Sequence, residues 1–347
     1  MQADFVRAFG EANAERGAAL GLEMVEQPFQ SVLDRFNAGE IPVGDLYKLT
    51  EWPKRWVWDF DMYAPIFQAA RERNMPLVAL NTATEVQREV PLQGMAALSS
   101  ADVGRYLPDR AGFAAMLRRP GFLDYAENII MPSYDTHRSA GWLGSQDAAR
   151  ATPQFFMLAR VLRDEAMSAA AWRYLEVAPS GVERPQAMVV LVGADHVKFG
   201  YGMTERLRRL SAGVQRYAVK DVAISVQTEP RAEAKVVAKL GPNELFEAGP
   251  LTDVADESGY RYRKLADGRG YARVETGGGR PASVVSLQGN AKTVASVILN
   301  PTEYDTLAAE TGSPLLRLPL ANVPEKDWPK LADWLWYDET DKGGVLA

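Results

Sequence analysis

Three short, unbroken runs of apolar residues are separated by longer amphipathic segments in the first two thirds of the chain. The runs lie at 18–22 (AALGL), 76–80 (PLVAL) and 187–192 (AMVVLV). Continuous apolar runs of this length, separated by helical segments, are typical of strands that are buried on both faces of a parallel sheet. The pattern therefore predicts an α/β layered domain over residues 1–228, with a mainly parallel sheet and flanking helices.

The spacing of apolar residues between and after these runs indicates the flanking helices. We expect helices at 2–16, 28–38 and 43–49, and a helix that follows the aromatic stretch at 52–63 and ends at residue 73. Further helices are expected in parts of 82–150, at 153–176 and at 203–210, with a further strand within 217–227. The helix at 153–176 is the longest, and Thr152 followed by Pro153 is a suitable start for it.

Beyond Pro230 the composition changes. Glycines gather at 268–279, polar residues alternate with valines, and the helical spacing fades. Residues 229–347 are therefore expected to form a C-terminal extension that is α+β or β-rich and that could bind a protein. Within it, 284–299 is expected to form one strand pair, and 328–336 a short closing helix.

The overall composition narrows the function classes. Hydrophobic residues make up 47% of the chain and charged residues 24%, as in ordinary globular proteins. The net charge of −6 argues against a nucleic-acid groove. No window approaches the roughly 18 apolar residues of a membrane span, and 1–17 has no apolar segment of the signal-peptide kind.

The chain contains no cysteine and only two histidines, His137 and His196. The lack of cysteine excludes disulfides, thiolate zinc sites, iron–sulfur clusters and lipid attachment through a cysteine. No dinucleotide-binding glycine motif, P-loop, H-E-x-x-H or G-x-S-x-G motif is present.

A polar side chain follows each of the three predicted strands. These are Glu23, Asn81 and His196. Because the carboxyl ends of parallel strands meet at one edge of a sheet, the three side chains are expected to converge there, where ligands of open α/β sheets bind. The alternative is that each one only meets water or caps the next helix.

Arg163 is the one charged residue on an otherwise apolar or aromatic stripe of the helix at 153–176. A buried guanidinium needs a carboxylate or an anionic ligand. Glu23, Asp164 and Glu165 are the candidate partners. Alternatively, the side chain extends past the end of the stripe to reach water.

Aromatic side chains are unusually dense at 52–63. Such a stretch either fills a core or forms a flat apolar surface for a ligand, to which Tyr47 or Tyr63 would add a phenolic oxygen. Tyr134 and His137 are further candidate ligating residues, although a lone histidine in such a segment is most often a surface residue.

Several short blocks between residues 20 and 210 occur together. They read LEM at 22–24, QSVLDRF at 30–36, LTEW at 49–52, WVWDFDMYAPI at 56–66, PLVALN at 76–81, RDEAM at 163–167 and GADH at 193–196. In this order they resemble the ChaN-like haem-binding uptake family of the Tiki/TraB/erythromycin-esterase-like superfamily. The likeness covers somewhat more than half of the chain, and the family's first strand would precede residue 1.

This resemblance implies an α/β fold that binds haem or a related tetrapyrrole for uptake, storage or trafficking, without catalysis. In the family, haem lies at a dimer interface and is ligated by tyrosine, so a homodimer is expected. Tyr63, Tyr134 and Tyr47 are the candidate iron ligands in that order, and Arg163 is expected to pair with a propionate. The residues expected around the cofactor are Tyr63, Tyr134, Tyr47, Trp56, Arg163, Glu23, Asn81 and His196.

Two alternatives remain open at this point. The chain could be a metal-dependent hydrolase of the same superfamily that uses Glu23, Asn81 and His196, with Glu23 and His196 as metal ligands or base. It could also be a scaffold that has lost its ligand. The compartment is open as well, because the resemblance extends to bacterial envelope proteins and to plastid proteins.

Overall fold

The computed structural model describes residues 1–119, 121–141, 152–176, 185–212, 215–220, 222–242, 244–251, 255–265, 268–276, 284–287, 294–299, 307–308, 314–320 and 323–336. Two compact units emerge. The first comprises Met1–Ala171, Arg184–Leu207 and Val294–Ala347, and the second Trp172–Glu183 and Arg208–Thr293. Most of the second unit is therefore inserted into the sequence of the first. The division of the chain at residue 228 stays a prediction.

The first unit is built on a three-stranded parallel sheet. Strand β1 (Ala18–Glu26) lies between β2 (Leu77–Asn81) and β3 (Ala187–Leu191). Leu20 is level with Leu77 on one side and with Val189 on the other. The predicted α/β layered architecture with a parallel sheet is confirmed.

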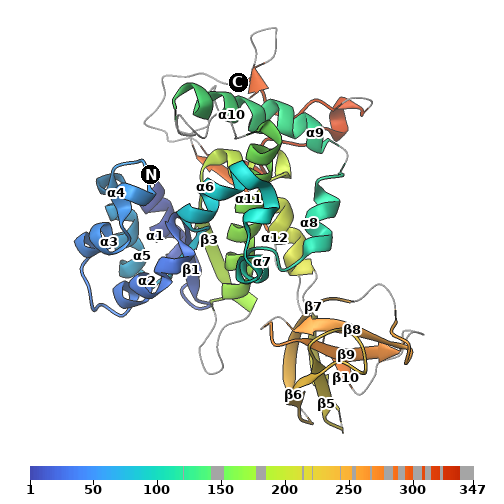
Figure 1. Ribbon diagram of the computed structural model, residues 1–347. Helices are drawn as coiled ribbons and strands as arrows, with labels where there is room; N and C mark the ends of the chain where they lie inside the picture. The colour runs from blue at the N-terminus through green and yellow to red at the C-terminus, as the bar shows by residue number, and fades with distance from the viewer. Residues whose placement is uncertain are drawn as a thin grey trace. The chain divides into compact units, whose positions relative to one another are not determined.

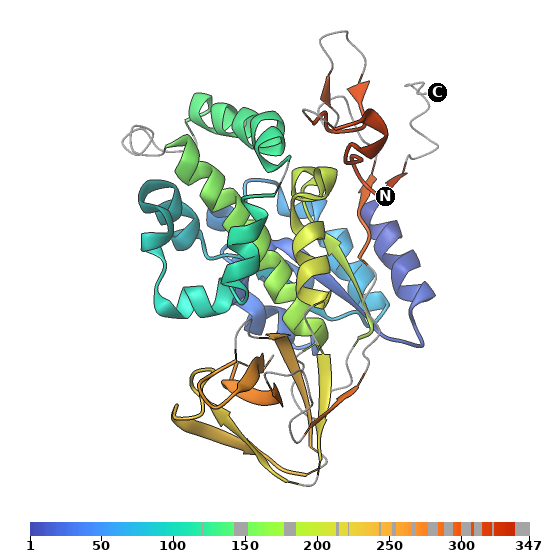
Figure 2. The same ribbon diagram turned by 90° about the vertical axis from the view of Figure 1, so that its right-hand side faces the viewer.

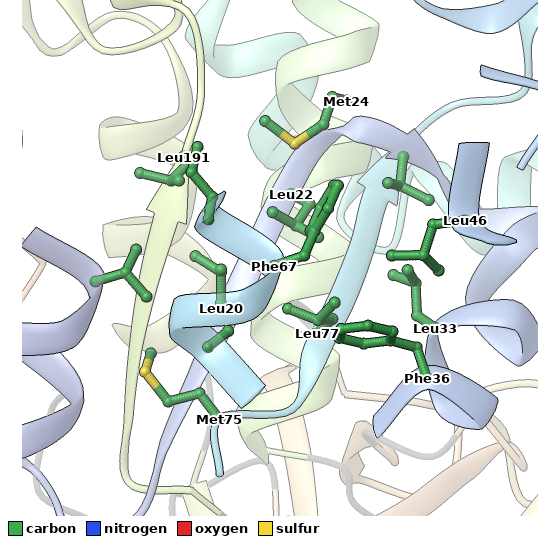
Figure 3. Close-up of a cluster of buried hydrophobic side chains, with 14 of the residues drawn as sticks. Leu20, Leu22, Met24, Leu33, Phe36, Leu46, Phe67, Met75, Leu77 and Leu191 are labelled. Carbon is green, nitrogen blue, oxygen red and sulfur yellow. The ribbon is translucent and has the colours of Figure 1, made fainter. Parts of the chain in front are cut away.

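One face of this sheet carries the larger apolar side chains and is covered by the N-terminal helices (Figure 1). These are α1 (Gln2–Ala12), α2 (Gln30–Asn37), α3 (Val43–Leu49) and α5 (Ala64–Glu72). In Figure 3 the side chains of Phe36 and Phe67 lie over the strand leucines. Because side chains alternate between the faces of a strand, Leu20 and Leu22 of β1 face this core.

The other face of β1 carries Gly21 and Glu23. A Cβ atom at Gly21 would lie 2.8 Å from Leu80 and 3.2 Å from Met188 and Val190, so the neighbouring strands close over this position. Helix α11 (Pro153–Glu176) supplies Arg163, one of the partners of Glu23, and is the long helix that Figure 2 shows in yellow-green. Its N-terminus is capped as predicted, because the Phe155 N–H donates to Thr152 Oγ1 at 3.1 Å.

Short helices and turns make up the rest of the described N-terminal part. They are η1 (Gln27–Phe29), α4 (Trp52–Arg55), η2 (Phe60–Met62), α6 (Thr84–Gln93), η3 (Gly94–Ala97), α7 (Ser100–Tyr106), α8 (Arg110–Met116), α9 (Phe122–Tyr125), the π-helical turn η4 (Ala126–Ile130), α10 (Met131–Ser139), η5 (Ala194–His196), η6 (Lys198–Gly200) and α12 (Met203–Ala212). The prediction that 82–150 is helical in places is confirmed for its described residues. None of the described helices is long and apolar enough to cross a membrane.

A late segment of the chain completes a second apolar core in the first unit. Ile298, Leu318 and Leu331 are buried there among side chains of α7 to α11. The Leu331 carbonyl accepts a hydrogen bond of 2.9 Å from the N–H of Phe199. Phe199 has φ +56°, a conformation that non-glycine residues rarely adopt and that persists only where the surroundings hold it.

The described elements of this late segment are short. They are β11 (Val297–Leu299), β12 (Leu307–Ala308), β13 (Pro314–Leu315), η7 (Glu325–Asp327) and β14 (Trp334–Trp336), with β11 parallel to β14 and β12 antiparallel to β13.

The predicted closing helix at 328–336 is wrong. Pro329 disfavours helical geometry at Trp328, which has φ −65° and ψ 139°. Further along, the Ser296 N–H and hydroxyl both donate to Asp333, which supports the extended pairing of β11 with β14. The predicted strand pair within 284–299 is also wrong, because the two strands there belong to different sheets.

The second unit is an antiparallel sheet of seven strands. In spatial order they are β10 (Val284–Leu287), β4 (Gln215–Val219), β7 (Leu245–Leu251), β8 (Tyr260–Leu265), β9 (Tyr271–Thr276), β5 (Ile224–Gln227) and β6 (Val236–Leu240). Alternate residues of these strands form its core, in which the rings of Tyr217 and Phe246 are stacked with their centroids 5.3 Å apart. The prediction of a β-rich C-terminal extension is confirmed.

Candidate functional site

The polar residues that follow the three strands meet at the carboxyl edge of the sheet. The Asn81 side chain donates to the Glu23 carbonyl at 2.8 Å, and His196 Nε2 lies 3.2 Å from Glu23 Oε1. All three side chains are buried. The predicted convergence is confirmed, and it arises because β1 is the central strand and pairs with both neighbours in parallel.

The Glu23 carboxylate is the hub of this cluster. Oε1 accepts a hydrogen bond of 2.5 Å from Arg163 Nη2, and Oε2 accepts one of 2.6 Å from the Gly193 N–H. Burial opposes ionisation, but the charges of His196 and Arg163 and these hydrogen bonds outweigh it and lower the pKa of Glu23. The structure thus holds Glu23 as a carboxylate, with both oxygens in use.

Arg163 is held on its other side by Asn81. Its Nε donates to Asn81 Oδ1 at 3.0 Å, and Gln87 Nε2 approaches the same oxygen at 3.3 Å. Of the three candidate partners in the sequence, Glu23 is the one that pairs with Arg163. The alternative, in which the side chain extends to water, is wrong.

The two acidic residues after Arg163 have partners of their own. Asp164 is fully buried, and its Oδ1 makes a short contact with Nδ1 of His196. Despite burial, the charge of His196 and this hydrogen bond lower the pKa of Asp164. Glu165 is also fully buried and forms an ion pair of 3.5 Å with Arg206. Asp164 is a site residue that the sequence offered only as a partner for Arg163.

One helical turn before Asp164, Arg160 has an unusual environment. Its Nε and Nη2 atoms are buried and have no hydrogen-bond partner among the described residues. Burial lowers the pKa of Arg160, but the charges of Asp164, Tyr125, Asp195 and Glu23 prevail and raise it. Arg160 is therefore a cation that is surrounded by acidic groups but forms no hydrogen bond to them through Nε or Nη2. Nothing in the sequence pattern distinguished this residue.

Aromatic rings lie beside Arg160. Phe156, one turn earlier on α11, contacts Tyr134 and His137 of α10 edge-on, at 5.3 and 5.4 Å between ring centroids. Tyr134 is buried and His137 is half-buried on a helix, not in a loop. Burial and the charges of Arg160 and Arg163 lower the pKa of His137, against the effect of its 2.7 Å contact with the Ser133 carbonyl.

The aromatic stretch at 52–63 divides between core and surface. Trp52 and Phe60 are buried in the first core, whereas Trp58 is 57% exposed. Tyr63 is half-buried, with its ring centroid 5.3 Å from that of Trp52 and 6.4 Å from that of Trp56. The core interpretation therefore holds for Trp52 and Phe60, and the interpretation of the stretch as a ligand surface stays a prediction.

The three candidate tyrosines occupy different environments. Burial and the charge of Glu23 raise the pKa of Tyr63, so this phenol lies within electrostatic reach of the carboxyl edge, while Trp56 acts in the opposite direction. Tyr134 belongs to the aromatic group beside Arg160. Tyr47 is 45% exposed, and its ring contacts that of Phe60 edge-on. The structure brings Glu23, Asn81, Arg163 and His196 together, but it does not place the three tyrosines in one group.

Comparisons with known proteins agree with the sequence blocks. Residues 1–207 match the model of the family described as "Haem-binding uptake, Tiki superfamily, ChaN". A solved structure described as "Cofacial heme binding to ChaN of Campylobacter jejuni" is similar at 15% identity, covering 60% of this chain and 69% of that chain, with a TM-score of 0.36. No curated protein matches.

Proposed function

This chain belongs to the ChaN family of haem-binding uptake proteins in the Tiki superfamily, and on that premise we propose that it binds haem or a related tetrapyrrole for uptake, storage or trafficking and does not catalyse a reaction. The observation that carries the proposal is the group of aromatic rings beside the buried cationic side chains of α11. Phe156, Tyr134 and His137 offer apolar ring surface, and Arg160 offers unpaired donors.

The residues present fit such a ligand. A porphyrin has a flat apolar face that suits aromatic rings, and two propionates that need cations. A phenolate is a suitable ligand for ferric haem iron. Tyr63 and Tyr134 are the phenols to test first, because both are shielded from water, and Tyr47 comes third because it is exposed.

The cluster around Glu23 has a different role in this proposal. Arg163 uses its donors on Glu23 and Asn81, and His196 is held between Glu23 and Asp164. These residues fix the end of β1 against α11, and they thereby support the surface that the ligand would contact. The expected pairing of Arg163 with a propionate would require Arg163 to release Glu23.

The hydrolase alternative gains no supporting observation. Within the described ranges, no three His, Asp or Glu side chains come together closely enough to hold a metal ion. His196 is 2% exposed, and both of its ring nitrogens contact carboxylates. A substrate or metal at His196 would first have to displace these partners.

A titration with ferric haem tests the proposal. We expect saturable changes in the Soret and charge-transfer bands, with the high-spin pattern of phenolate ligation. Either Tyr63→Phe or Tyr134→Phe should abolish that pattern, and Tyr271→Phe in the second unit is the control that should leave it intact. Only weak, non-saturating changes in the wild-type protein would overturn haem binding. Sedimentation of the same samples tests whether the chain forms the homodimer that is expected from the family resemblance.

A further inference from the structure

We propose that the Nε–Nη2 edge of Arg160 is the receptor for a carboxylate of the bound ligand, which in haem is a propionate. This inference rests on the proposed function and assigns one contact within it. It also moves the carboxylate-binding role from Arg163 to the arginine one turn earlier on α11.

The free atoms of Arg160 form the side of the guanidinium that matches a carboxylate. Nε and Nη2 carry N–H groups that point in parallel, so one carboxylate can accept from both. Both atoms are buried and unpartnered among the described residues. The residue as a whole is partly exposed, while these two atoms are shielded from water.

The neighbouring acidic groups do not take this edge. Asp164 lies one turn further along α11, but its Oδ1 contacts His196. Glu23 uses both carboxylate oxygens on Arg163 and Gly193. The Asp195 carboxylate accepts a hydrogen bond of 2.6 Å from Lys198. Among the described residues, none of these carboxylates forms a hydrogen bond with this edge, although Asp164 Oδ2 is itself buried without a hydrogen-bond partner and the charges of all three carboxylates favour the cationic form of Arg160.

Two arginines one turn apart thus have separate roles. Arg163 donates from Nε and Nη2 to Asn81 and Glu23, so its corresponding edge is in use within the protein. Arg160 presents the same two atoms without a partner. Leaving buried donors unpaired costs free energy, and a ligand carboxylate would recover it on binding.

The surroundings indicate the class of ligand. Phe156 is one turn before Arg160 on the same helix, and its ring contacts those of Tyr134 and His137. Aromatic rings next to a cationic fork suit a flat conjugated molecule that bears a carboxylate. A small inorganic anion could accept hydrogen bonds from the Arg160 guanidinium but would make no favourable contact with the aromatic rings.

The experiment compares ferric haem with its dimethyl ester, in which both propionates are esterified, on wild-type protein and on Arg160→Gln. We expect the substitution to weaken haem binding about ten- to a hundredfold, as for loss of a hydrogen-bonded charge pair, and to leave ester binding unchanged. Arg138→Gln, an exposed arginine on α10, is the matched control and should alter neither affinity. Arg160→Lys keeps the charge without the fork and should give an intermediate loss.

The thermal stability of the ligand-free variants provides a second readout. Because Nε and Nη2 of Arg160 form no hydrogen bond while nearby carboxylates favour its charge, Arg160→Lys, which keeps the charge, should unfold at about the wild-type temperature, and Arg160→Gln, which removes it, should unfold at a lower one. A clear drop in both Arg160→Gln and Arg160→Lys would assign Arg160 a structural role and overturn the inference.

The titrations separate the two proposals. Saturable haem binding that Arg160→Gln leaves unchanged, or weakens equally for haem and ester, would overturn the role of Arg160 and leave the proposed function standing. Absence of saturable binding of either compound to the wild-type protein would overturn both.

Discussion

Arg163 on helix α11 donates a 2.5 Å hydrogen bond to Glu23 on strand β1, which precedes it by 140 residues. The side chain of Glu23 is 7% exposed and that of Arg163 is 23% exposed, so water screens this ion pair only weakly. The contact joins the central strand to the helix that covers its second face. It therefore sets the position of the residues on the neighbouring turns of α11, Arg160 included.

Removing Arg163 should be strongly destabilising. Arg163→Leu leaves a buried carboxylate without its arginine partner, and we expect a loss of about 3–5 kcal/mol in the free energy of unfolding. The double variant Glu23→Gln/Arg163→Leu should recover a large part of that loss, because no uncompensated charge remains. Urea unfolding of the two single variants and the double variant measures the coupling. A loss below about 1 kcal/mol in Arg163→Leu would contradict a structural role for the pair.

Glu26 should make stability depend on pH in the direction opposite to most carboxylates. Burial raises its pKa above the ordinary 4.5, against the effects of Thr84 and Arg55. A raised native pKa means that the folded state binds the proton more tightly. The contribution of Glu26 to the free energy of unfolding is therefore fully present below pH 4.5, and it is lost as the pH rises through the pKa of Glu26 in the folded state.

Urea unfolding across pH 4–7 measures this effect as the difference between wild type and Glu26→Gln. The free energy of unfolding of the wild type should fall relative to that of Glu26→Gln as the pH rises. Glu85, which also pairs with Arg55, is the control. Hydrogen bonding lowers the pKa of Glu85, but its side chain is 69% exposed, so Glu85→Gln should give a smaller difference of the opposite sign.

The late segment of the first unit should contribute substantially to stability. Leu318 is fully buried, whereas Leu316, two residues earlier, is 42% exposed. We expect Leu318→Ala to cost about 2–5 kcal/mol through lost burial and the cavity left behind, and Leu316→Ala to stay within about 0.5 kcal/mol. Chemical denaturation of both variants tests this. Equal, small losses would mean that the segment does not complete the second core.

Gly202 should tolerate no side chain. A Cβ atom there would lie 1.9 Å from the carbonyl oxygen of His196, and backbone atoms cannot turn aside as a side chain can. Gly202→Ala should therefore cost about 1–3 kcal/mol or more. Gly104 is exposed within α7 and has nothing within 4 Å of its Cβ position, so Gly104→Ala should instead stabilise by about 0.5–1 kcal/mol. Thermal unfolding of the two variants should thus shift in opposite directions.

Local patterns in the sequence were sufficient for the sheet and for part of the site. The apolar runs identify β1, β2 and β3, and the parallel arrangement that they imply brings Glu23, Asn81 and His196 together. Such convergence follows from strand direction alone. It needs no knowledge of how the helices are rotated.

The partners on α11 could not be predicted in the same way. Arg160, Arg163 and Asp164 lie on neighbouring turns, and which of them reaches the strand ends depends on the rotation of the helix about its axis. That rotation is set by contacts with residues far away in the sequence. The pairing of Asp164 with His196 and the free edge of Arg160 emerge only when this packing is known.

The same limit explains the errors after residue 284. Val284 begins a strand that pairs with β4, and Trp334 begins one that pairs with β11. Both pairings depend on long-range order, which no local window contains. The prediction of a helix at 328–336 also did not take into account that Pro329 disfavours helical geometry at the residue before it.

The insertion of the second unit has a consequence for synthesis in the cell. Phe199 and Leu331 share a hydrogen bond, but Arg208–Thr293 must be translated between the two residues. At about 5–20 residues per second, a ribosome needs on the order of ten seconds for the stretch that separates them. During that delay the nascent first unit lacks Ile298, Leu318 and Leu331, and the apolar side chains that these residues cover stay open to chaperones or to neighbouring nascent chains.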